Sequence, residues 1–322
     1  MPISGPSSYP PTTREFIDHW EAVNTRLGAE MMLSGGASVG ELGDQLANLE
    51  GARGTVTDRG VDRALARESL DDLIRKLQGK LVEFNARVRS DFAGTKWERL
   101  LSVAFAVGDA EDAVRDGTRR FAYLWGKVNA VTSPPAGVTL PMVLQGNYSL
   151  SVLGTDLTAL GGLYADLTHA EEDLKQAREA RNDIQDVIYP ILKAYRMKVP
   201  TVLPANDSLI DSLPSLTPPA GHTPDAVALQ GTWNAAEAKA EFTWEESTEA
   251  QLSRYELRGV PGDEYNAEDE AVLATVAAGE TRAASSAFAL GSPGLTASFK
   301  IYVVLQDGHE KGSEAVTVHR PA

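Results

Sequence analysis

A serine flanked by glycines is the first pattern in the sequence that could support catalysis. The segment Gly36-Ala-Ser-Val-Gly40 matches the nucleophile elbow, in which Ser38 would lie on a sharp turn between a strand and a helix. The preceding residues 31–33 are expected to end a helix, so the required strand is missing. No histidine is placed nearby as a general base, since the five histidines are scattered at positions 19, 169, 222, 309 and 319. We therefore predict a glycine-rich loop between helices and no catalytic residue at Ser38.

Two acidic patterns could bind metal ions. Asp166 and His169 have the i, i+3 spacing of a helical metal pair, with Glu171 and Glu172 close behind. A di-metal site in a helical bundle needs this motif twice, so a solvated helix face is the preferred interpretation. The acidic loop, residues 263–270, offers hard oxygen ligands suited to calcium but lacks the glycine and the spacing of a known calcium loop. We expect an exposed loop there, and calcium binding stays open.

The composition excludes several classes of chemistry. The chain has no cysteine, which removes disulfides, thiolate nucleophiles and cysteine-based metal sites. Glycine-rich nucleotide-binding motifs are absent as well. The formal net charge of -15 argues against a nucleic-acid partner, because binding phosphates requires clustered lysine and arginine, and it also disfavours anionic membranes. The sequence therefore predicts no catalytic, cofactor-binding or metal-binding residue and no cofactor.

The location of the protein is left open by the sequence. The first residues lack a basic segment followed by an apolar one, so no cleaved secretory signal is visible. No apolar run approaches the roughly 18 residues of a membrane-spanning helix. We expect either the cytoplasm or export by a route without such a signal.

Helical periodicity dominates residues 13–197, after a proline-rich segment, residues 1–12, that is predicted to be a flexible leader. Thr12 or Thr13 is a suitable N-cap for a first helix that ends near the glycines at 28, 35 and 36. A weaker helix is expected over 39–49, with a break around Gly51 and Gly54. The clearest apolar seam then recurs at steps of three and four, at Leu70, Leu73, Leu77, Leu81, Phe84, Val88 and Phe92.

Further helices are predicted along the same region. One is expected over 97–107 and another over 112–131, and the aromatic residues Trp97, Phe105, Phe121 and Trp125 are interpreted as core rather than as a partner-binding surface. A long helix is expected from Leu140, with Pro190 as a kink. Its seam includes Leu150, Leu153, Leu157, Leu160, Tyr164 and Leu167, and continues to Tyr195.

These seams must be buried against each other or against copies of the same chain. The sequence therefore predicts an elongated N-terminal α-helical bundle over 13–197, in which the seams around 61–93 and 140–197 are partners. A homo-oligomer is one outcome of such packing. Six prolines between residues 198 and 224 then predict a semi-rigid linker and a domain boundary.

After Pro224 the period changes from helical to alternating, as expected for strands. Seven short strands are predicted, at 226–234, 238–245, 254–260, 271–277, 285–290, 297–306 and 314–318. Seven strands in about a hundred residues indicate a β-sandwich over 225–322. This domain has 16 acidic and 7 basic residues, hence a net charge of -9.

These residues resemble the fibronectin type III family of Ig-like sandwiches. Phe242-Thr-Trp244 looks like the family's second strand with its core tryptophan, and Tyr255-Glu-Leu-Arg258 looks like the third. Leu295 ahead of Tyr302 is similar to the leucine that precedes the family's core tyrosine. The resemblance implies binding or spacing, outside the cell or in assemblies, rather than catalysis. A helical region followed by such a domain also looks like bacterial proteins.

The fold class expected is thus multidomain α and β, and the architecture favours a non-enzymatic structural or interaction protein. Its partner would be another protein or a further copy of the chain. The mechanism would be burial of the seams around Leu77 and Leu157, with the shape and charge of the acidic sandwich setting contacts. Two alternatives stay open: a membrane-active helical effector or pore-forming protein, and an enzyme whose site residues are scattered in the sequence.

Overall fold

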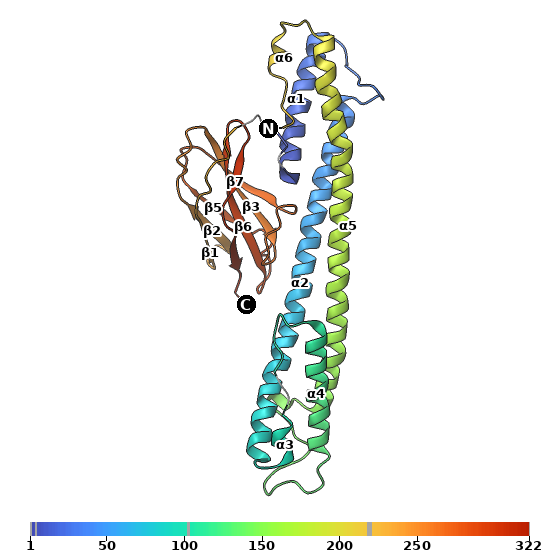
Figure 1. Ribbon diagram of the computed structural model, residues 1–322, viewed down its shortest axis with the longest axis vertical. Helices are drawn as coiled ribbons and strands as arrows, with labels where there is room; N and C mark the ends of the chain where they lie inside the picture. The colour runs from blue at the N-terminus through green and yellow to red at the C-terminus, as the bar shows by residue number, and fades with distance from the viewer. Residues whose placement is uncertain (1, 4, 102–103, 218–220, 322) are drawn as a thin grey trace. The chain divides into compact units, whose positions relative to one another are not determined.

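The computed structural model describes residues 2–3, 5–101, 104–217 and 221–321, and it combines an N-terminal helical region with a C-terminal region of antiparallel strands. The chain divides into two compact units. Unit 1 contains residues 1–64 and 172–322, and unit 2 contains residues 65–171. Two long helices, α2 (Val39–Asp91) and α5 (Leu150–Val202), contribute residues to both units. Figure 1 shows the elements by label and colour.

The helical part of unit 1 is organised around aromatic residues of α1 (Tyr9–Leu27). Trp20 stacks on Tyr195 of α5 with ring centroids 4.7 Å apart, and Phe16 meets the same tyrosine edge to face. The helix ends at the first of the three glycines named as its possible end, because Gly28 adopts a left-handed φ of 66° that residues with side chains avoid. Residues 31–33, predicted to end a helix, lie outside it. Buried apolar residues of α2 and of the last turns of α5 complete this core, among them Leu42, Leu49, Ile188, Leu192 and Val199.

The predicted leader and linker differ from what the structure contains. A short 3-10 helix, η1 (Pro6–Ser8), leads directly into α1, and Thr12 and Thr13 are fully buried inside α1 rather than capping it. The helix can begin this early because Pro10 and Pro11 occupy its first turn, where a backbone N–H has no partner within the helix. In the proline-rich segment, α5 extends to Val202, α6 (Ser208–Asp211) follows, and two leucines join the helical core, Leu203 and Leu216.

The break expected around Gly51 and Gly54 is absent, since α2 is one helix of 53 residues. Glycine lowers helix propensity by only about 1 kcal/mol, and packing on both sides of these positions outweighs that amount. Gly60 has a more specific reason to lack a side chain. A Cβ at this position would lie 3.0 Å from the Cγ of Pro261, which belongs to the strand region of the same unit.

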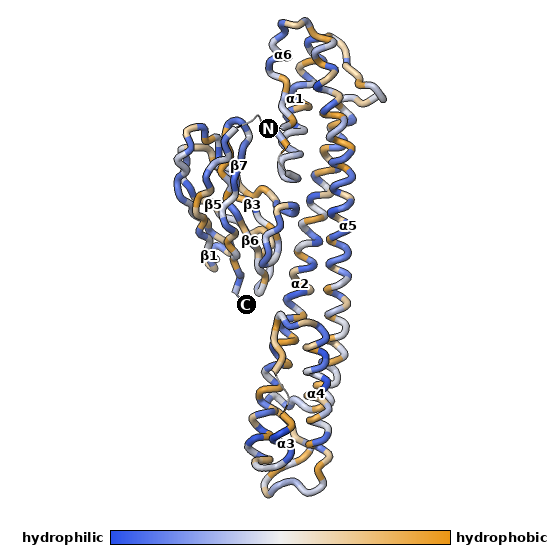
Figure 2. Tube along the Cα trace, viewed as in Figure 1, coloured by the Kyte–Doolittle hydropathy of each residue, from blue (hydrophilic) through white to orange (hydrophobic). Residues whose placement is uncertain are grey.

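Unit 2 is built on the seam that the sequence predicts. Leu77, Leu81 and Phe84 of α2 are fully buried, and they pack with residues of α4 (Glu111–Asn129) and of the first turns of α5. Phe121 and Trp125 are also fully buried and stack 5.5 Å apart, and Phe105 is buried, which confirms these three aromatic residues as core. Trp97 is only partly buried against the same core. Hydrophobic and hydrophilic positions alternate along these helices in Figure 2, as expected for apolar seams.

Two helix boundaries in unit 2 were predicted wrongly. Within the predicted span 97–107, of which residues 102–103 lie outside the described residues, the described part has only α3 (Lys96–Arg99) as a helix. Phe105 reaches Gly117, where a Cβ would lie 2.8 Å from the phenyl ring. The long helix begins at Leu150 rather than Leu140. Before it, the backbones of Leu144 and Tyr148 exchange two hydrogen bonds across the short helix η2 (Gln145–Asn147), which closes a turn.

The strands of unit 1 form two antiparallel sheets, with orders β1-β2-β5 and β4-β3-β6-β7, and β8 also pairs with β6. Their shared core includes Phe242, Trp244, Tyr255 and Phe299, which confirms Trp244 as a core tryptophan. The bounds are β1 (Leu229–Asn234), β2 (Lys239–Trp244), β3 (Leu252–Pro261), β4 (Ala271–Ala277), β5 (Ala283–Ser286), β6 (Thr296–Leu305), β7 (Glu310–Gly312) and β8 (Val316–His319).

Most strand predictions overlap these bounds, with three differences. The predicted strand 285–290 is β5, which ends at Ser286, because the backbone turns there and Leu290 N donates to Ala287 O. The last predicted strand is preceded by the short β7. Tyr302 does not lie in the apolar core, because its neighbours Ile301 and Val303 point there instead and Tyr302 lies on the opposite face of β6.

Within the described residues, no helix is both long enough and apolar enough to cross a membrane.

Replacing a seam residue should destabilise unit 2 much more than replacing an exposed residue of the same helix. Leu77 is fully buried, so Leu77→Ala is expected to lower the free energy of unfolding by about 2–5 kcal/mol. Val82 is 57% exposed, and Val82→Ala should change the free energy by less than about 0.5 kcal/mol. Urea denaturation followed by circular dichroism measures both. Equal losses for the two variants would contradict the assignment of the seam.

Candidate functional site

The most concentrated chemistry in the structure surrounds Arg258 of β3, whose guanidinium is almost completely buried. It donates to Glu256 Oε2 at 2.7 Å through one terminal nitrogen and to Glu270 Oε1 at 2.7 Å through the other. Glu310 accepts hydrogen bonds from both terminal nitrogens. The guanidinium also lies 3.9 Å from the ring centroid of Tyr302. Three carboxylates and an aromatic face therefore replace the water that this cation loses.

The period of the strand explains why these groups meet. Side chains alternate along β3, so Arg254, Glu256 and Arg258 share one face while Tyr255 and Leu257 enter the apolar core. Arg254 donates to the other carboxylate oxygen of Glu256 at 2.7 Å. On the polar face of β3, Glu256 and Arg258 are as buried as the residues of its apolar face. Such burial is unusual for the outer face of a sandwich. Another part of the chain must therefore cover it.

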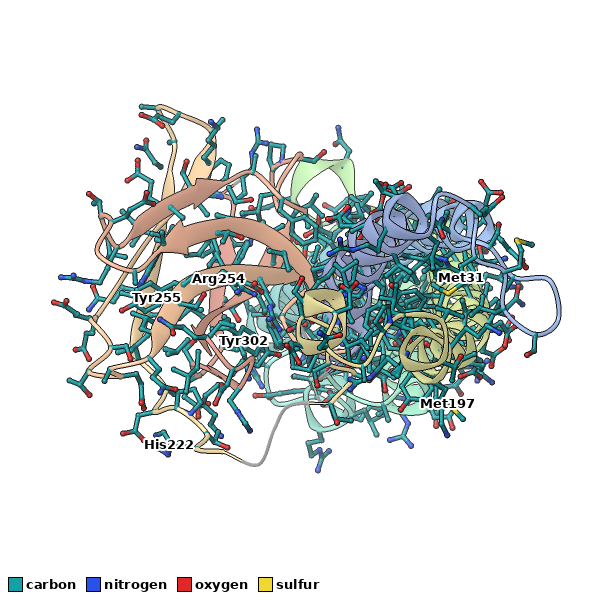
Figure 3. All side chains as sticks on the ribbon, turned by 90° about the horizontal axis from the view of Figure 1, so that it is seen from above. Met31, Met197, His222, Arg254, Tyr255 and Tyr302 are labelled. Atoms are coloured by element: carbon teal, nitrogen blue, oxygen red, sulfur yellow. The ribbon has the colours of Figure 1, made fainter. Side chains whose placement is uncertain are left out.

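Glu270 is the second centre of the cluster. Besides Arg258, its carboxylate accepts from the hydroxyls of Tyr265 at 2.6 Å and Tyr302 at 2.9 Å. Burial raises the pKa of both tyrosines, and the nearby charge of Glu270 adds to that rise. Both hydroxyls therefore stay protonated as donors. Figure 3 labels Tyr302, with Arg254 and Tyr255, on the sheet that contains β3 and β6.

The pKa of Arg258 reflects the same arrangement. Burial alone would lower it, but the hydrogen bond and charge of Glu310, together with Glu270 and Glu256, raise it above its ordinary value. The guanidinium is therefore a permanent cation.

Three arginines of the long helices bind the acidic loop that ends at Glu270. Arg178 makes a two-pronged contact with the carboxylate of Asp269, and its hydrogen bond to Asp269 raises its pKa. Arg181, which is only 2% exposed, donates to the carbonyl of Glu268. Arg53 of α2 donates to the carbonyl of Glu270 at 3.0 Å. We call these three arginines with residues 268–270 the arginine joint.

The segment before α1 covers the remaining polar surface. Ser7 Oγ accepts from Arg258 at 3.2 Å, while Arg53 donates to the carbonyls of Pro6 and Ser7 at 3.2 Å each. The backbone N–H of Ile3 donates to Leu216 O at 2.9 Å. Residues predicted as a flexible leader are thus bonded to α2, to β3 and to the segment after α6.

Two cavities lie beside the joint. The larger has a volume of about 570 Å³ and is lined by residues of α1, α2, β3 and β4; the smaller, of about 210 Å³, is lined mainly by α2 and residues 268–271. The larger volume is in the range of cavities that hold small molecules. Arg53 lines both of them.

The structure places the sequence-derived candidates apart from this site. Ser38 Oγ accepts from the backbone N–H of Glu41 at 3.3 Å at the start of α2, which is the geometry of a helix cap, and no strand precedes it. Asp166 and His169 are exposed on α5. Among the residues that the structure describes, no group of three or more histidine or acidic side chains is arranged to hold a metal. The acidic loop is not simply exposed, because Asp269 and Glu270 bind arginines.

Sequence reasoning missed the cluster around Arg258 and the arginine joint. Their groups are far apart in the chain, as with Arg53 and Glu270, and no local spacing indicates such a pair. One local signal did exist: Arg254, Glu256 and Arg258 put three charges on one face of a single strand. A strand with that pattern needs counter-charges if its outer face is covered.

Lowering the pH should weaken the cluster through Glu256. Burial alone would raise the pKa of this carboxyl, but the charges of Arg258 and Arg254 outweigh it and lower the pKa below the ordinary value of 4.5. The stability that such a group contributes is complete above the pKa of the unfolded chain and is lost as the pH falls through the folded value. We expect the free energy of unfolding to fall below about pH 4.5, and to fall less steeply in Glu256→Gln.

Urea unfolding between neutral pH and about pH 3 measures this slope. Glu237→Gln is the matched control, because Glu237 is exposed in the turn before β2 and its replacement should leave the slope unchanged. A Glu256→Gln variant with the same pH dependence as the wild type would contradict the role given to this carboxylate.

Comparison with known proteins gives no family for the chain: no protein-family model and no curated protein matches it. Solved structures match only part of it. A structure of pectate lyase PelI from Erwinia chrysanthemi in complex with tetragalacturonic acid is 22% identical, with a TM-score of 0.25, and the match covers 29% of this chain and 28% of the lyase. The chain thus spans less than a third of the length of that enzyme.

Two further matches are to isolated domains. An Fn3-like protein from Clostridium thermocellum is 14% identical over 31% of this chain and 97% of its own, with a TM-score of 0.24. A human FNIII domain, the fourth of its protein, is 19% identical over 31% of this chain and 82% of its own, with a TM-score of 0.25. Structures of fibronectin type III-like domains thus match about 30% of the chain.

Proposed function

We propose that the protein is a non-enzymatic structural or interaction protein, in which the arginine joint holds the β-sandwich at a fixed position on the helices of unit 1. The observation that carries this proposal is that the carboxylates near Arg258 are already paired within the chain. The carboxylates of Glu256, Glu270 and Asp269 bind arginines of the same chain. Carboxylates that are paired within the chain can hold one part of the chain against another.

The physical strength of the joint supports a fixed arrangement. Arg181 and Arg258 are both almost fully buried, and leaving such a cation without its partners costs several kcal/mol. Separation of the sandwich from the helices would break the contacts of Arg53, Arg178 and Arg181 together. Gly60 adds a steric match, because its missing side chain makes room for Pro261.

We also propose that the protein interacts with further copies of its own chain. Exposed apolar side chains of unit 2 support this self-association. Leu100 and Tyr123 are 59% and 67% exposed. Apolar side chains this exposed lose contact with water when another protein covers them. The proposed mechanism is self-association through the helical region, with the acidic sandwich held at a set position.

Reversing the charge of Arg178 should open the joint. In Arg178→Glu the new carboxylate faces Asp269, and repulsion replaces a two-pronged hydrogen bond. We expect faster amide hydrogen exchange in residues 263–270 and a larger radius of gyration by small-angle X-ray scattering. Lys175→Glu on the same helix is the matched control, since the Lys175 side chain is 74% exposed and pairs with Glu179 at 3.9 Å, outside the joint.

The double variant Arg178→Glu with Asp269→Arg restores opposite charges and should recover part of the protection from exchange. If Arg178→Glu leaves both exchange and radius unchanged, the joint does not hold the sandwich.

Self-association predicts a mass above that of one chain. Light scattering of the purified full-length protein should give a multimer, and the double variant Leu100→Lys with Tyr123→Lys should dissociate it, because two charges would enter the proposed contact. Circular dichroism checks that the helices persist. A wild-type monomer over the whole accessible concentration range would contradict self-association and leave a different protein as the partner.

A further inference from the structure

The larger cavity beside the joint has the composition of a binding cleft. Its volume of about 570 Å³ is lined by residues of α1 and α2 and by residues of β3 and β4, and it is open to solvent. Part of its wall is apolar, formed by Pro10, Pro11 and Val272, and another part has arginine side chains. Ligand sites of proteins combine these features and lie preferentially where two structural regions meet.

The arginines of the cleft differ in their partners. Arg14 is paired with Glu50, and Arg254 with Glu256. Arg53 has no ion pair among the residues that the structure describes: its hydrogen bonds go to the carbonyls of Pro6, Ser7 and Glu270. The carboxylate of Glu270 accepts hydrogen bonds from Arg258 and from two tyrosine hydroxyls rather than from Arg53.

Arg53 is therefore a partly buried cation held by neutral oxygens. Burial is the main cause that lowers its pKa, and the charges of Arg181 and Arg258 add to the effect, while the charges of Glu270 and Glu50 oppose it. Its Nε makes no hydrogen bond within the described residues, so one donor is left for a ligand. An anion in the cleft would offset the cost of burying this charge.

We propose that this cleft, which we call the Arg53 cleft, binds a small organic carboxylate. The carboxylate lies on Arg53 and an apolar body packs on Pro10, Pro11 and Val272. The charge count favours a monoanion: three arginines and two glutamates line the cleft, which leaves one positive charge. Guanidinium and carboxylate have matching planar geometries. This inference goes beyond the proposed structural function, because a fixed joint does not require a ligand.

Benzoate and benzamide are suitable probes, since they share an aromatic body and only benzoate has a charge. Binding to the full-length protein is measured by isothermal titration calorimetry and by saturation-transfer NMR. We expect benzoate to bind about tenfold more tightly than benzamide, as for a charge-assisted hydrogen bond. Equal affinities, or no binding of benzoate, would overturn the proposal.

Val272→Glu tests the position of the site. Val272 is 41% exposed in the cleft and makes none of the hydrogen bonds of the joint, so the variant is expected to fold. Its carboxylate would compete for Arg53 and weaken benzoate binding about tenfold or more. Val82→Glu, an exposed valine of unit 2, is the control and should bind as the wild type does. Unchanged binding to Val272→Glu would place the site elsewhere and overturn the proposal.

Hydrogen exchange in residues 263–270, measured on the same samples, separates this result from failure of the joint. If exchange shows a closed joint and benzoate does not bind, the cleft proposal alone is wrong. If the joint is open in the wild type, the cleft does not form, and both proposals are wrong.

Discussion

The burial of one guanidinium, that of Arg258, is the constraint on which the rest of unit 1 depends. A cation without water requires several acceptors around it, and β3 alone supplies only Glu256. Glu270 must come from the end of the acidic loop before β4, Glu310 from β7, and Ser7 from the segment before α1. Each of these groups fixes the path of its own segment. The charge at one position of a strand thus determines where four separate parts of the chain lie.

The arginine joint connects the groups around Arg258 to the helices. The loop that delivers Glu270 to Arg258 presents its backbone carbonyls and Asp269 to the other side, where Arg53, Arg178 and Arg181 bind them. The loop therefore satisfies two sets of cations at once, one on the sandwich and one on the helices.

Features of this fold that repeat along the sequence could be predicted from it. Contacts between residues far apart in the sequence could not. The seam through Leu77 and Phe84 repeats every three or four residues, so its helix and its burial were both predicted correctly. Strands such as β3 and β6 follow from alternation. The helix predicted over 97–107 ends at Arg99 instead. Phe105 packs into the space above Gly117, and no local pattern encodes such a contact between segments. The site around Arg258 was missed for the same reason, since its partners are up to 251 positions away in the sequence.

The division of the chain also sets an order of events during synthesis on the ribosome. Unit 2 is one continuous stretch of sequence, whereas unit 1 is made of an early and a late segment. Unit 2 can therefore complete its core while the polypeptide is still growing. Arg53, in contrast, emerges long before Glu270, and at about 5–20 residues per second it waits roughly 10–40 s for the loop that it binds. Until α5 has been synthesised, Phe16 and Trp20 also lack their partner Tyr195, so the nascent chain exposes them to chaperones and to other chains.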